Sequence, residues 1–274
     1  MSHPSRLPSS LVLVGAGKMG GSMLEGWLKV GVRPEGVTVL DPKPSDEMTR
    51  FCRERGIALN PASLSAPEVL VLAIKPQMLD EAAPALNGAL GPETLIISIL
   101  AGKTIGDLRS RLPAAGAIVR AMPNLPASIG RGATGAAAND TVSEDQRLMA
   151  DALLGSNGIV EWLPSEDLID AVTALSGSGP AYVFHLVECL AEAGAAAGLP
   201  ADLAQRLARA TVTGAGELLF QSDLPPANLR QNVTSPGGTT AAALDVLMRD
   251  PDGLKALMRE AVAAAKRRAE ELAG

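Results

Sequence analysis

The alternation of short apolar runs with helical patterns constrains the fold of the N-terminal half more than any other feature of the sequence. The apolar runs are rich in Val, Ile and Leu and occupy residues 11–15, 37–41, 69–74, 94–99 and 117–122. The helical patterns lie between them, at residues 18–30, 45–55, 78–89 and 104–111. Each connection is long enough for a right-handed crossover, so the pattern predicts an α/β fold with a Rossmann-type, doubly wound parallel sheet.

The sequence changes character near Pro164. A helix at 143–154 and a short strand at 159–163 complete the first half, and the remainder has an all-helical pattern. Turn-forming residues at 198–200, 223–226 and 235–238 divide it into predicted helices of roughly fifteen to twenty residues, the last at 252–272. We therefore predict a dinucleotide-binding Rossmann domain at 1–163 and an all-helical C-terminal domain for dimerisation and substrate binding at 164–274.

The charge balance excludes some classes of partner. A formal net charge of -6 and a pI of about 5.1 would repel a phosphate backbone, so no nucleic acid is expected to bind. The apolar run at 11–14 is too short for a signal peptide or a membrane span, which predicts a cytoplasmic protein without a membrane partner. Cys52 and Cys189 lack metal-ligand spacing, so we expect two buried free thiols and no metal site.

A glycine-rich loop follows the first apolar run. Residues 15–20 read Gly15, Ala16, Gly17, Lys18, Met19 and Gly20, which is GxGxxG between a strand and a helix, the context that the dinucleotide fingerprint requires. Gly15 permits the tight turn, Gly17 lets the backbone approach a pyrophosphate, and Gly20 allows close helix packing. The helix N-terminus adds amide donors and the positive end of its dipole. The loop therefore predicts binding of NADPH or NADH.

The end of the second apolar run bears on the choice between these cofactors. Asp41 follows that run, where a carboxylate would accept a hydrogen bond from a ribose 2'-hydroxyl and repel a 2'-phosphate. Lys43 lies two residues further on and would instead attract a 2'-phosphate, or be a solvated loop lysine. Asp41 alone favours NADH, but Lys43 leaves the preference between the two cofactors open.

Four later segments carry a family resemblance. They are LAIKPQ at 72–77, RAMPNLPASIGRGATG at 120–135, DAVTALSGSGPAYVF at 170–184 and VTSPGGTTAAAL at 233–244. In this order, and together with the glycine loop, they resemble pyrroline-5-carboxylate reductase from about residue 11 to 250. The sequence departs from the family at Leu125, where threonine is more usual. The resemblance implies NAD(P)H-dependent reduction of 1-pyrroline-5-carboxylate to L-proline, the last step of proline biosynthesis.

The resemblance also implies site residues. The dinucleotide is expected to be surrounded by Val14, Gly15, Ala16, Gly17, Lys18, Met19, Asp41, Asn60, Ala73, Ile74, Lys75, Pro76, Ile99, Leu100 and Ala101. The imino acid is expected to be surrounded by Glu166, Asn232, Thr239 and Thr240. Residues 73–76 and 99–101 follow predicted strands, where ligands bind in open α/β sheets. Glu166 would accept a hydrogen bond from the ring nitrogen, or be a solvated acid near a helix start.

A loop in the second half is a candidate site for the carboxylate of the substrate. Ser235, Pro236, Gly237, Gly238, Thr239 and Thr240 immediately precede or begin a helix predicted to run to about Met248. A helix start offers unpaired amides, and the glycines remove side chains that would block an anion. Ser235 and Thr240 would add hydroxyl donors. In the alternative interpretation Ser235 is only an N-cap and Pro236 the first helical residue.

The sequence is poor in proton donors, which bears on the chemistry. The chain has two histidines, His3 and His185, and one tyrosine, Tyr182. Reduction of a ketone needs a positioned donor for the developing alkoxide, whereas a cyclic imine can be protonated at nitrogen before hydride transfer. We expect His185 to be packed or solvated rather than catalytic, because the sequence shows no acidic partner for it. No catalytic residue is assigned.

Two other functions are alternatives to this one. A β-hydroxyacid dehydrogenase shares the glycine loop and a helical second domain, but its catalytic lysine has no counterpart in Tyr182–Ala193. A scaffold that senses NAD(P)H without turnover would have no reason to keep the 235–240 loop. The alanine-rich helices of the second half are only weakly amphipathic, so we expect a homodimer, and the resemblance allows further assembly of dimers.

Overall fold

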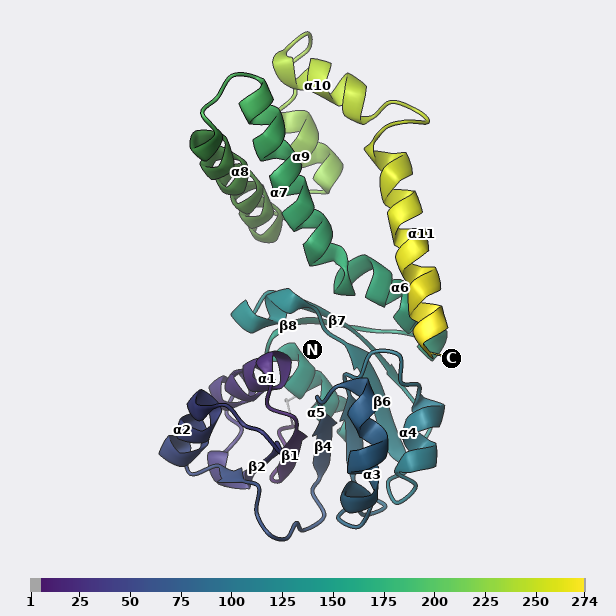
Figure 1. The fold of residues 1–274 in the computed structure, drawn as a ribbon. Coiled ribbons are helices and arrows are strands. Elements are labelled where there is room, and N and C mark those ends of the chain that lie inside the picture. Colours follow the sequence, from purple (N-terminus) through teal and green to yellow (C-terminus); the bar gives the residue numbers. More distant parts are fainter. Residues whose placement is uncertain (1–5, 274) are drawn as a thin grey trace. The chain divides into compact units, whose positions relative to one another are not determined.

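The computed structural model describes residues 6–273, which form two compact units. The first unit contains the chain up to Gly177 together with the segment from Lys266 onward, and the second contains Ser178–Ala265. Figure 1 shows a sheet with covering helices in the first unit and helices alone in the second. The predicted fold class, a Rossmann-type sheet followed by an all-helical segment, is confirmed.

Eight strands form one sheet in the first unit, in the order β3-β2-β1-β4-β5-β6-β7-β8. They are β1 (Leu11–Val14), β2 (Val37–Leu40), β3 (Ala58–Leu59), β4 (Val69–Leu72), β5 (Leu95–Ser98), β6 (Ala117–Met122), β7 (Gly132–Ala138) and β8 (Gly158–Trp162). Leu11 of β1 pairs with Val37 on one side and with Val69 on the other, both in parallel. Strands β1 to β6 are parallel as predicted, but β7 runs antiparallel to β6.

Helices cover both faces of this sheet (Figure 1). Leu11 and Leu13 pack with α1 (Lys18–Lys29), α2 (Asp46–Arg55) and α5 (Glu144–Gly155). Val12 and Val14 face the other way and pack with α3 (Leu79–Asn87) and α4 (Ile105–Arg111). Because successive side chains of a strand point to opposite faces, β1 contributes to both layers of the core. The sheet is therefore doubly wound, and its loops open at the carboxyl edge of the strands.

The compact units do not divide at the predicted boundary between residues 163 and 164. The segment after β8 forms the 3-10 turn η4 (Glu166–Leu168), α6 (Ile169–Val172) and the π-helical turn η5 (Thr173–Gly177), all within the first unit. Ile169 and Ala174 in this segment are fully buried. The Cβ position of Gly135 in β7 lies 2.8 Å from a Val172 methyl group, so α6 packs directly on the sheet. The functional division at 163/164 stays a prediction.

The second unit contains helices only. They are α7 (Gly179–Ala196), α8 (Ala201–Gln221), α9 (Pro226–Asn232), α10 (Thr239–Leu247) and most of α11 (Leu254–Ala273). The predicted breaks are confirmed: Gly198 has a φ of 103° between α7 and α8, and Gly237 a φ of 67° before α10. Helix α10 ends next to Met248 as predicted, but α9 is shorter than predicted, because Pro225 and the turn at 235–238 limit it to 7 residues.

Two further expectations concern cysteines and membranes. Both cysteines are free, and Cys52 is buried, but Cys189 is exposed on α7, a helix that has no buried residue. The prediction of a buried thiol at Cys189 is therefore wrong for the single chain. Within residues 6–273, no helix combines the length and the apolar character that a membrane span needs.

Candidate functional site

The three glycines of the loop after β1 differ in what a side chain at each position would meet. Gly15 has a φ of 92°, a backbone conformation that residues other than glycine rarely adopt. A Cβ atom at Gly20 would lie 2.1 Å from the carbonyl oxygen of Gly15, so only glycine lets α1 approach the turn this closely. A Cβ atom at Gly17 would meet no atom within 4 Å. The fold therefore requires glycine at 15 and 20, whereas at 17 it leaves space for a ligand.

The start of α1 presents free amides toward that space. Gly17 is the N-cap of α1, and no side chain caps the helix. The first turn also contains no acidic residue. A carboxylate there would compete with an anionic ligand for the helix amides. Since the N-terminal amides of a helix and its dipole attract anions, this end of α1 suits a pyrophosphate.

Asp41 lies directly beside the glycine loop. One carboxylate oxygen of Asp41 accepts a hydrogen bond from the Ala16 amide at 2.8 Å, and the other accepts one from the Lys43 amide at 2.9 Å. Asn60 fixes the main chain of Asp41, because its side-chain amide pairs with both the N–H and the C=O of Asp41, at 2.9 and 2.8 Å. Asn60 holds a φ of 49°, unusual for a residue other than glycine. Asn60 thus positions Asp41, a role that the sequence did not reveal.

Two hollows meet at Asp41. One is lined by the glycine loop and the start of α2, and includes the cations Lys18 and Lys43 as well as the acids Glu25 and Glu47. The other is lined mainly by apolar side chains, including Val14, Leu40, Ile74 and Met78, with Asn60 at its edge. A polar hollow at the loop and an apolar one behind Asp41 suit the phosphate and the adenine ends of a dinucleotide, respectively.

The other predicted cofactor residues lie at the carboxyl edge of the same sheet. Ala73 follows β4 and donates its amide hydrogen to the Val14 carbonyl at 2.8 Å, and Ile99 follows β5 and donates to the Leu72 carbonyl at 3.0 Å. Lys75 and Pro76 lead into the 3-10 turn η2 (Pro76–Met78). The structure therefore brings the segments 14–20, 41, 60, 73–76 and 99–101 to one edge. Leu100 is 2% exposed and belongs to the core, so only its backbone is available to a ligand.

Cofactor choice can be tested at Asp41. We expect Asp41→Ser to raise the ratio of NADPH to NADH efficiency by on the order of tenfold, because removal of one negative charge beside the ribose removes its repulsion of a 2'-phosphate. The measurement is kcat/KM with each cofactor. Asp46→Ser removes an exposed carboxylate in the first turn of α2 and is the control. An unchanged ratio for Asp41→Ser would show that this carboxylate does not face the ribose.

Glu166 lies in η4, within a polar network of the first unit. One carboxylate oxygen, Oε1, accepts hydrogen bonds from the Ile105 amide at 2.8 Å and from the Arg120 guanidinium at 2.9 Å. Arg120 is almost completely buried in β6, and its other terminal nitrogen lies 3.7 Å from the Asp170 carboxylate. Sequence reasoning missed Arg120, although a single arginine in the apolar run 117–122 is the signal that could have found it.

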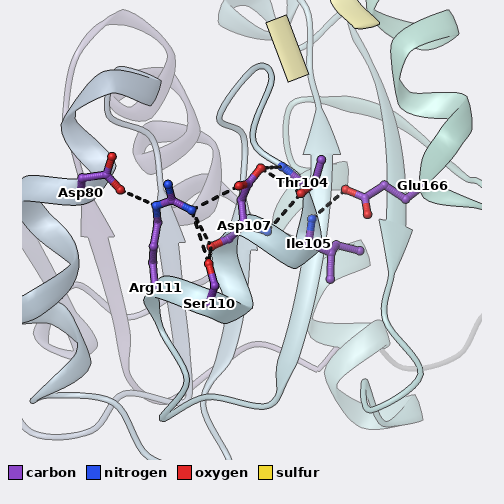
Figure 2. A network of polar contacts seen from close by, with 7 residues as sticks. All are labelled: Asp80, Thr104, Ile105, Asp107, Ser110, Arg111 and Glu166. Atoms are coloured by element: carbon purple, nitrogen blue, oxygen red, sulfur yellow. Dashed lines mark hydrogen bonds and ion pairs between the residues drawn. The ribbon is translucent and has the colours of Figure 1, made fainter. Parts of the chain in front are cut away.

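Figure 2 shows how this network continues along α4. Thr104 and Asp107 form a capping box at its start, and Arg111 near its end pairs with Asp107 and with Asp80 of α3. The hydrogen bond and charge of Arg111 outweigh the effect of burial and lower the pKa of Asp80. Burial raises the pKa of Asp107, but the hydrogen bonds from Thr104 and the charge of Arg111 outweigh it and leave that pKa lowered. The capping box thus fixes the start of α4, where the Ile105 amide donates to Glu166, and Arg111 ties the end of α4 to α3.

The remaining predicted substrate residues belong to the second unit. Asn232 ends α9, and Thr239 and Thr240 begin α10 as predicted. The N-cap of α10 is Gly238, with no side-chain cap, so the alternative in which Ser235 caps this helix is wrong. Gly238 instead donates its amide hydrogen to the Ser235 carbonyl at 3.0 Å. The start of α10 is therefore an open turn built from glycines and hydroxyl side chains.

His185 has a neighbour that the sequence reasoning overlooked. Its Nδ1 lies 2.9 Å from a carboxylate oxygen of Glu188, and both side chains are about 70% exposed, at 74% and 69%. An exposed pair of this kind contributes little to stability, so His185 is solvated as expected, although the argument that it lacks an acidic partner was wrong. Among residues 6–273 no cluster of three metal-ligating side chains is found.

Two family models match two parts of the chain. The model described as pyrroline-5-carboxylate reductase dimerisation matches residues 166–272. The model described as NADP oxidoreductase, coenzyme F420-dependent, matches residues 10–102, which include the glycine loop and Asp41. The strands β6, β7 and β8 lie between the two matched segments and complete the sheet.

Relatives and solved structures resemble the chain along nearly its whole length. Pyrroline-5-carboxylate reductase of Pseudomonas aeruginosa is 40% identical, with 96% of each chain covered, and that of Synechocystis is 43% identical, with 87% of this chain and 88% of the relative covered. The solved structure from Coxiella burnetii has a TM-score of 0.89 and 36% identity and covers 97% of this chain and 99% of its own. The Plasmodium falciparum enzyme, solved with NADP bound, has a TM-score of 0.75 and 28% identity, and the match covers 97% of this chain and 98% of its own.

Proposed function

This chain belongs to the pyrroline-5-carboxylate reductase family. We propose which of its residues bind the cofactor and which bind the imino acid. The reaction is the NAD(P)H-dependent reduction of 1-pyrroline-5-carboxylate to L-proline, the last step of proline biosynthesis. The observation that carries the proposal is the loop at Gly17, where the fold leaves open space in front of uncapped helix amides.

We assign the cofactor to the carboxyl edge of the sheet. The amides of Gly17 and Lys18 would hold the pyrophosphate, Asp41 the adenosine ribose, and the segments 73–76 and 99–101 the part of the cofactor that extends along the strand ends. When bound, the reduced nicotinamide supplies the hydride that the C=N carbon of the substrate accepts. The P. falciparum relative, whose structure contains NADP, supports the assignment.

We assign the imino acid to residues of two segments. The 235–240 loop would bind its carboxylate through amides at the start of α10 and through the hydroxyls of Ser235 and Thr240. Asn232 and Thr239 would complete the site, and Glu166 would accept a hydrogen bond from the ring nitrogen. A cyclic imine needs alignment against the nicotinamide more than a dedicated proton donor, which fits the solvated His185 and the absence of any other histidine among residues 6–273.

A direct assay tests this function. The purified chain is expected to oxidise NADH or NADPH only when 1-pyrroline-5-carboxylate is added, and to yield proline. The six-membered homologue tests the ring size that is accepted, and a 3-hydroxyacid with NAD(P)+ tests the β-hydroxyacid dehydrogenase alternative. Turnover of the hydroxyacid without turnover of the imine would overturn the proposal. Cofactor binding without either reaction would favour a sensing scaffold.

The carboxylate site can be tested at Thr240. Thr240→Val replaces the hydroxyl by a methyl group of similar size and is expected to weaken imino-acid binding by about 1–3 kcal/mol, the value of a charge-assisted hydrogen bond. The KM for the imino acid should rise accordingly, while the KM for the cofactor stays nearly unchanged. Thr213→Val is a matched control, because Thr213 lies on α8 and bonds to carbonyls of its own helix. Loss of cofactor binding in Thr240→Val would assign the loop to the nucleotide.

We further propose that the protein works in the cytoplasm as a homodimer, that dimers can assemble further, and that it binds no nucleic acid. The match of residues 166–272 to a dimerisation model supports the homodimer. The net charge of -6 supports the exclusion of nucleic acid.

A further inference from the structure

The buried Arg120 has no part in the function proposed so far. We infer that Arg120 is a positioning residue for the imino acid: it holds the Glu166 carboxylate in one orientation, so that a single oxygen of Glu166 is presented to the substrate. This inference rests on the proposed function, because it takes Glu166 to face the ring nitrogen.

Arg120 is placed by the sheet rather than by a loop. It lies in β6 between an antiparallel partner, Ala137 of β7, and a parallel partner, Ser98 of β5. Its side chain is 5% exposed and reaches two carboxylates, Glu166 at 2.9 Å and Asp170 at 3.7 Å. A buried guanidinium is costly unless it is paired, so the segment 166–170 and β6 constrain each other. The orientation of Glu166 is therefore set by a rigid element.

The two oxygens of Glu166 are not equivalent. Oε1 accepts two hydrogen bonds, one from the Ile105 amide at 2.8 Å and one from Arg120. Among the described residues, Oε2 accepts none. In Figure 2 the dashed line to Ile105 ends on one oxygen of Glu166, and the other oxygen carries no dashed line. The Glu166 side chain is 25% exposed, so a ligand can reach it. A carboxylate held in this way offers one acceptor of fixed direction.

Fixing the acceptor in advance has an energetic consequence. A glutamate that is free to rotate loses side-chain entropy when it binds a ligand, whereas one already held by Arg120 loses little. Lysine cannot replace this arginine, because an ammonium is a single point of charge and the guanidinium spans two carboxylates with separate nitrogens. We therefore expect Arg120 to act on imino-acid binding through Glu166 alone.

A double-mutant cycle tests this coupling. The wild type, Arg120→Lys, Glu166→Gln and the double variant are assayed, and the Michaelis constants for the imino acid and for NAD(P)H are compared. Each single variant is expected to raise the imino-acid KM by about tenfold, consistent with one weakened charge-assisted hydrogen bond. The double variant should be no worse than the more affected single variant, because both changes disrupt the same contact. The cofactor KM should change by less than about twofold.

The control separates positioning from stability. Arg111 also pairs with two carboxylates, Asp80 and Asp107, and belongs to the same network without contacting Glu166. Arg111→Lys is expected to lower the melting midpoint and leave both KM values unchanged. Circular dichroism melts of all variants report folding, and if Arg120→Lys folds poorly, Glu166→Gln alone still tests whether Glu166 contributes to imino-acid binding.

The outcomes are distinguishable from failure of the proposed function. If the wild type does not oxidise NAD(P)H with the imino acid, the function itself is wrong. If the wild type is active but the two substitutions have independent, multiplicative effects on KM, Arg120 does not act through Glu166. An Arg120→Lys variant that melts lower with an unchanged imino-acid KM would likewise overturn the inference and leave Arg120 as a residue of the fold.

Discussion

Gly17→Val should lower the affinity for NADH and NADPH by about 100-fold or more, while the free energy of unfolding falls by only about 1 kcal/mol. The backbone of Gly17 has a φ of -68°, which any L-residue adopts, and a Cβ atom there meets no protein atom within 4 Å. The Cβ atom of the added side chain therefore meets no protein atom, and the remaining cost to stability is that valine is a poorer N-cap than glycine. The side chain occupies the space in front of the first amides of α1, where the pyrophosphate must approach the backbone.

The glycine at position 20 provides the matched contrast. Gly20→Ala places a Cβ atom 2.1 Å from the carbonyl oxygen of Gly15, so the turn or α1 must shift, and both stability and cofactor affinity should fall. Cofactor affinity is measured by fluorescence titration and stability by thermal melting. A Gly17→Val variant that binds NADPH with wild-type affinity would show that the cofactor does not lie against this loop.

The parts of the fold that could be predicted from the sequence are those with a strong local signal. The runs that became β1, β2, β4, β5 and β6 are rich in Val, Ile and Leu, and the helices α2, α4 and α5 begin at the N-caps Ser45, Thr104 and Ser143. Buried parallel strands need apolar residues on both faces, so their composition alone identifies them. The glycine loop could be predicted for the same reason, since its position between strand and helix is itself a local feature.

Strand β7 could not be predicted, because its sequence has no strand propensity. It reads GATGAAA, and small residues are disfavoured in strands. Its composition follows from tertiary packing: the Cβ position of Gly135 lies 2.8 Å from a Val172 methyl group, and that of Gly132 lies 2.8 Å from the Cβ of Ala127. The pairing of β7 with β6 and β8 thus decides the strand, and the small residues are required by the close approach of neighbouring segments.

The polar network of the candidate site was also beyond sequence reasoning. Glu166 contacts Ile105 across 61 residues and Arg120 across 46. Asn60 similarly holds Asp41 from a separate segment. The sequence gives the identity of such residues, but only the folded chain shows which polar groups form hydrogen bonds with one another.

The helical unit should hold the chain in a dimer or a larger assembly at micromolar concentration. The midpoint of thermal unfolding should therefore rise with chain concentration. No residue of α7, α9 or α10 is buried within the chain. Exposed apolar side chains of this unit include Phe184 at 56%, Leu218 at 64% and Phe220 at 60%. Burial of each against a partner is worth about 1.5–3 kcal/mol, so water-exposed helices of this kind are unfavourable in a monomer.

A substitution in α8 tests this expectation without knowledge of the contacting face. Leu218, Leu219 and Phe220 are consecutive and exposed, and consecutive residues of a helix are about 100° apart, so at least one should face a partner. Replacing all three with serine should weaken association by at least about 2 kcal/mol, or about 30-fold in dissociation constant. Val30→Ser changes an apolar residue of similar exposure at the end of α1 and is the control. Light scattering gives the mass of each variant. A wild type that is monomeric at micromolar concentration would show that these apolar helices remain in water and that the dimer expectation is wrong.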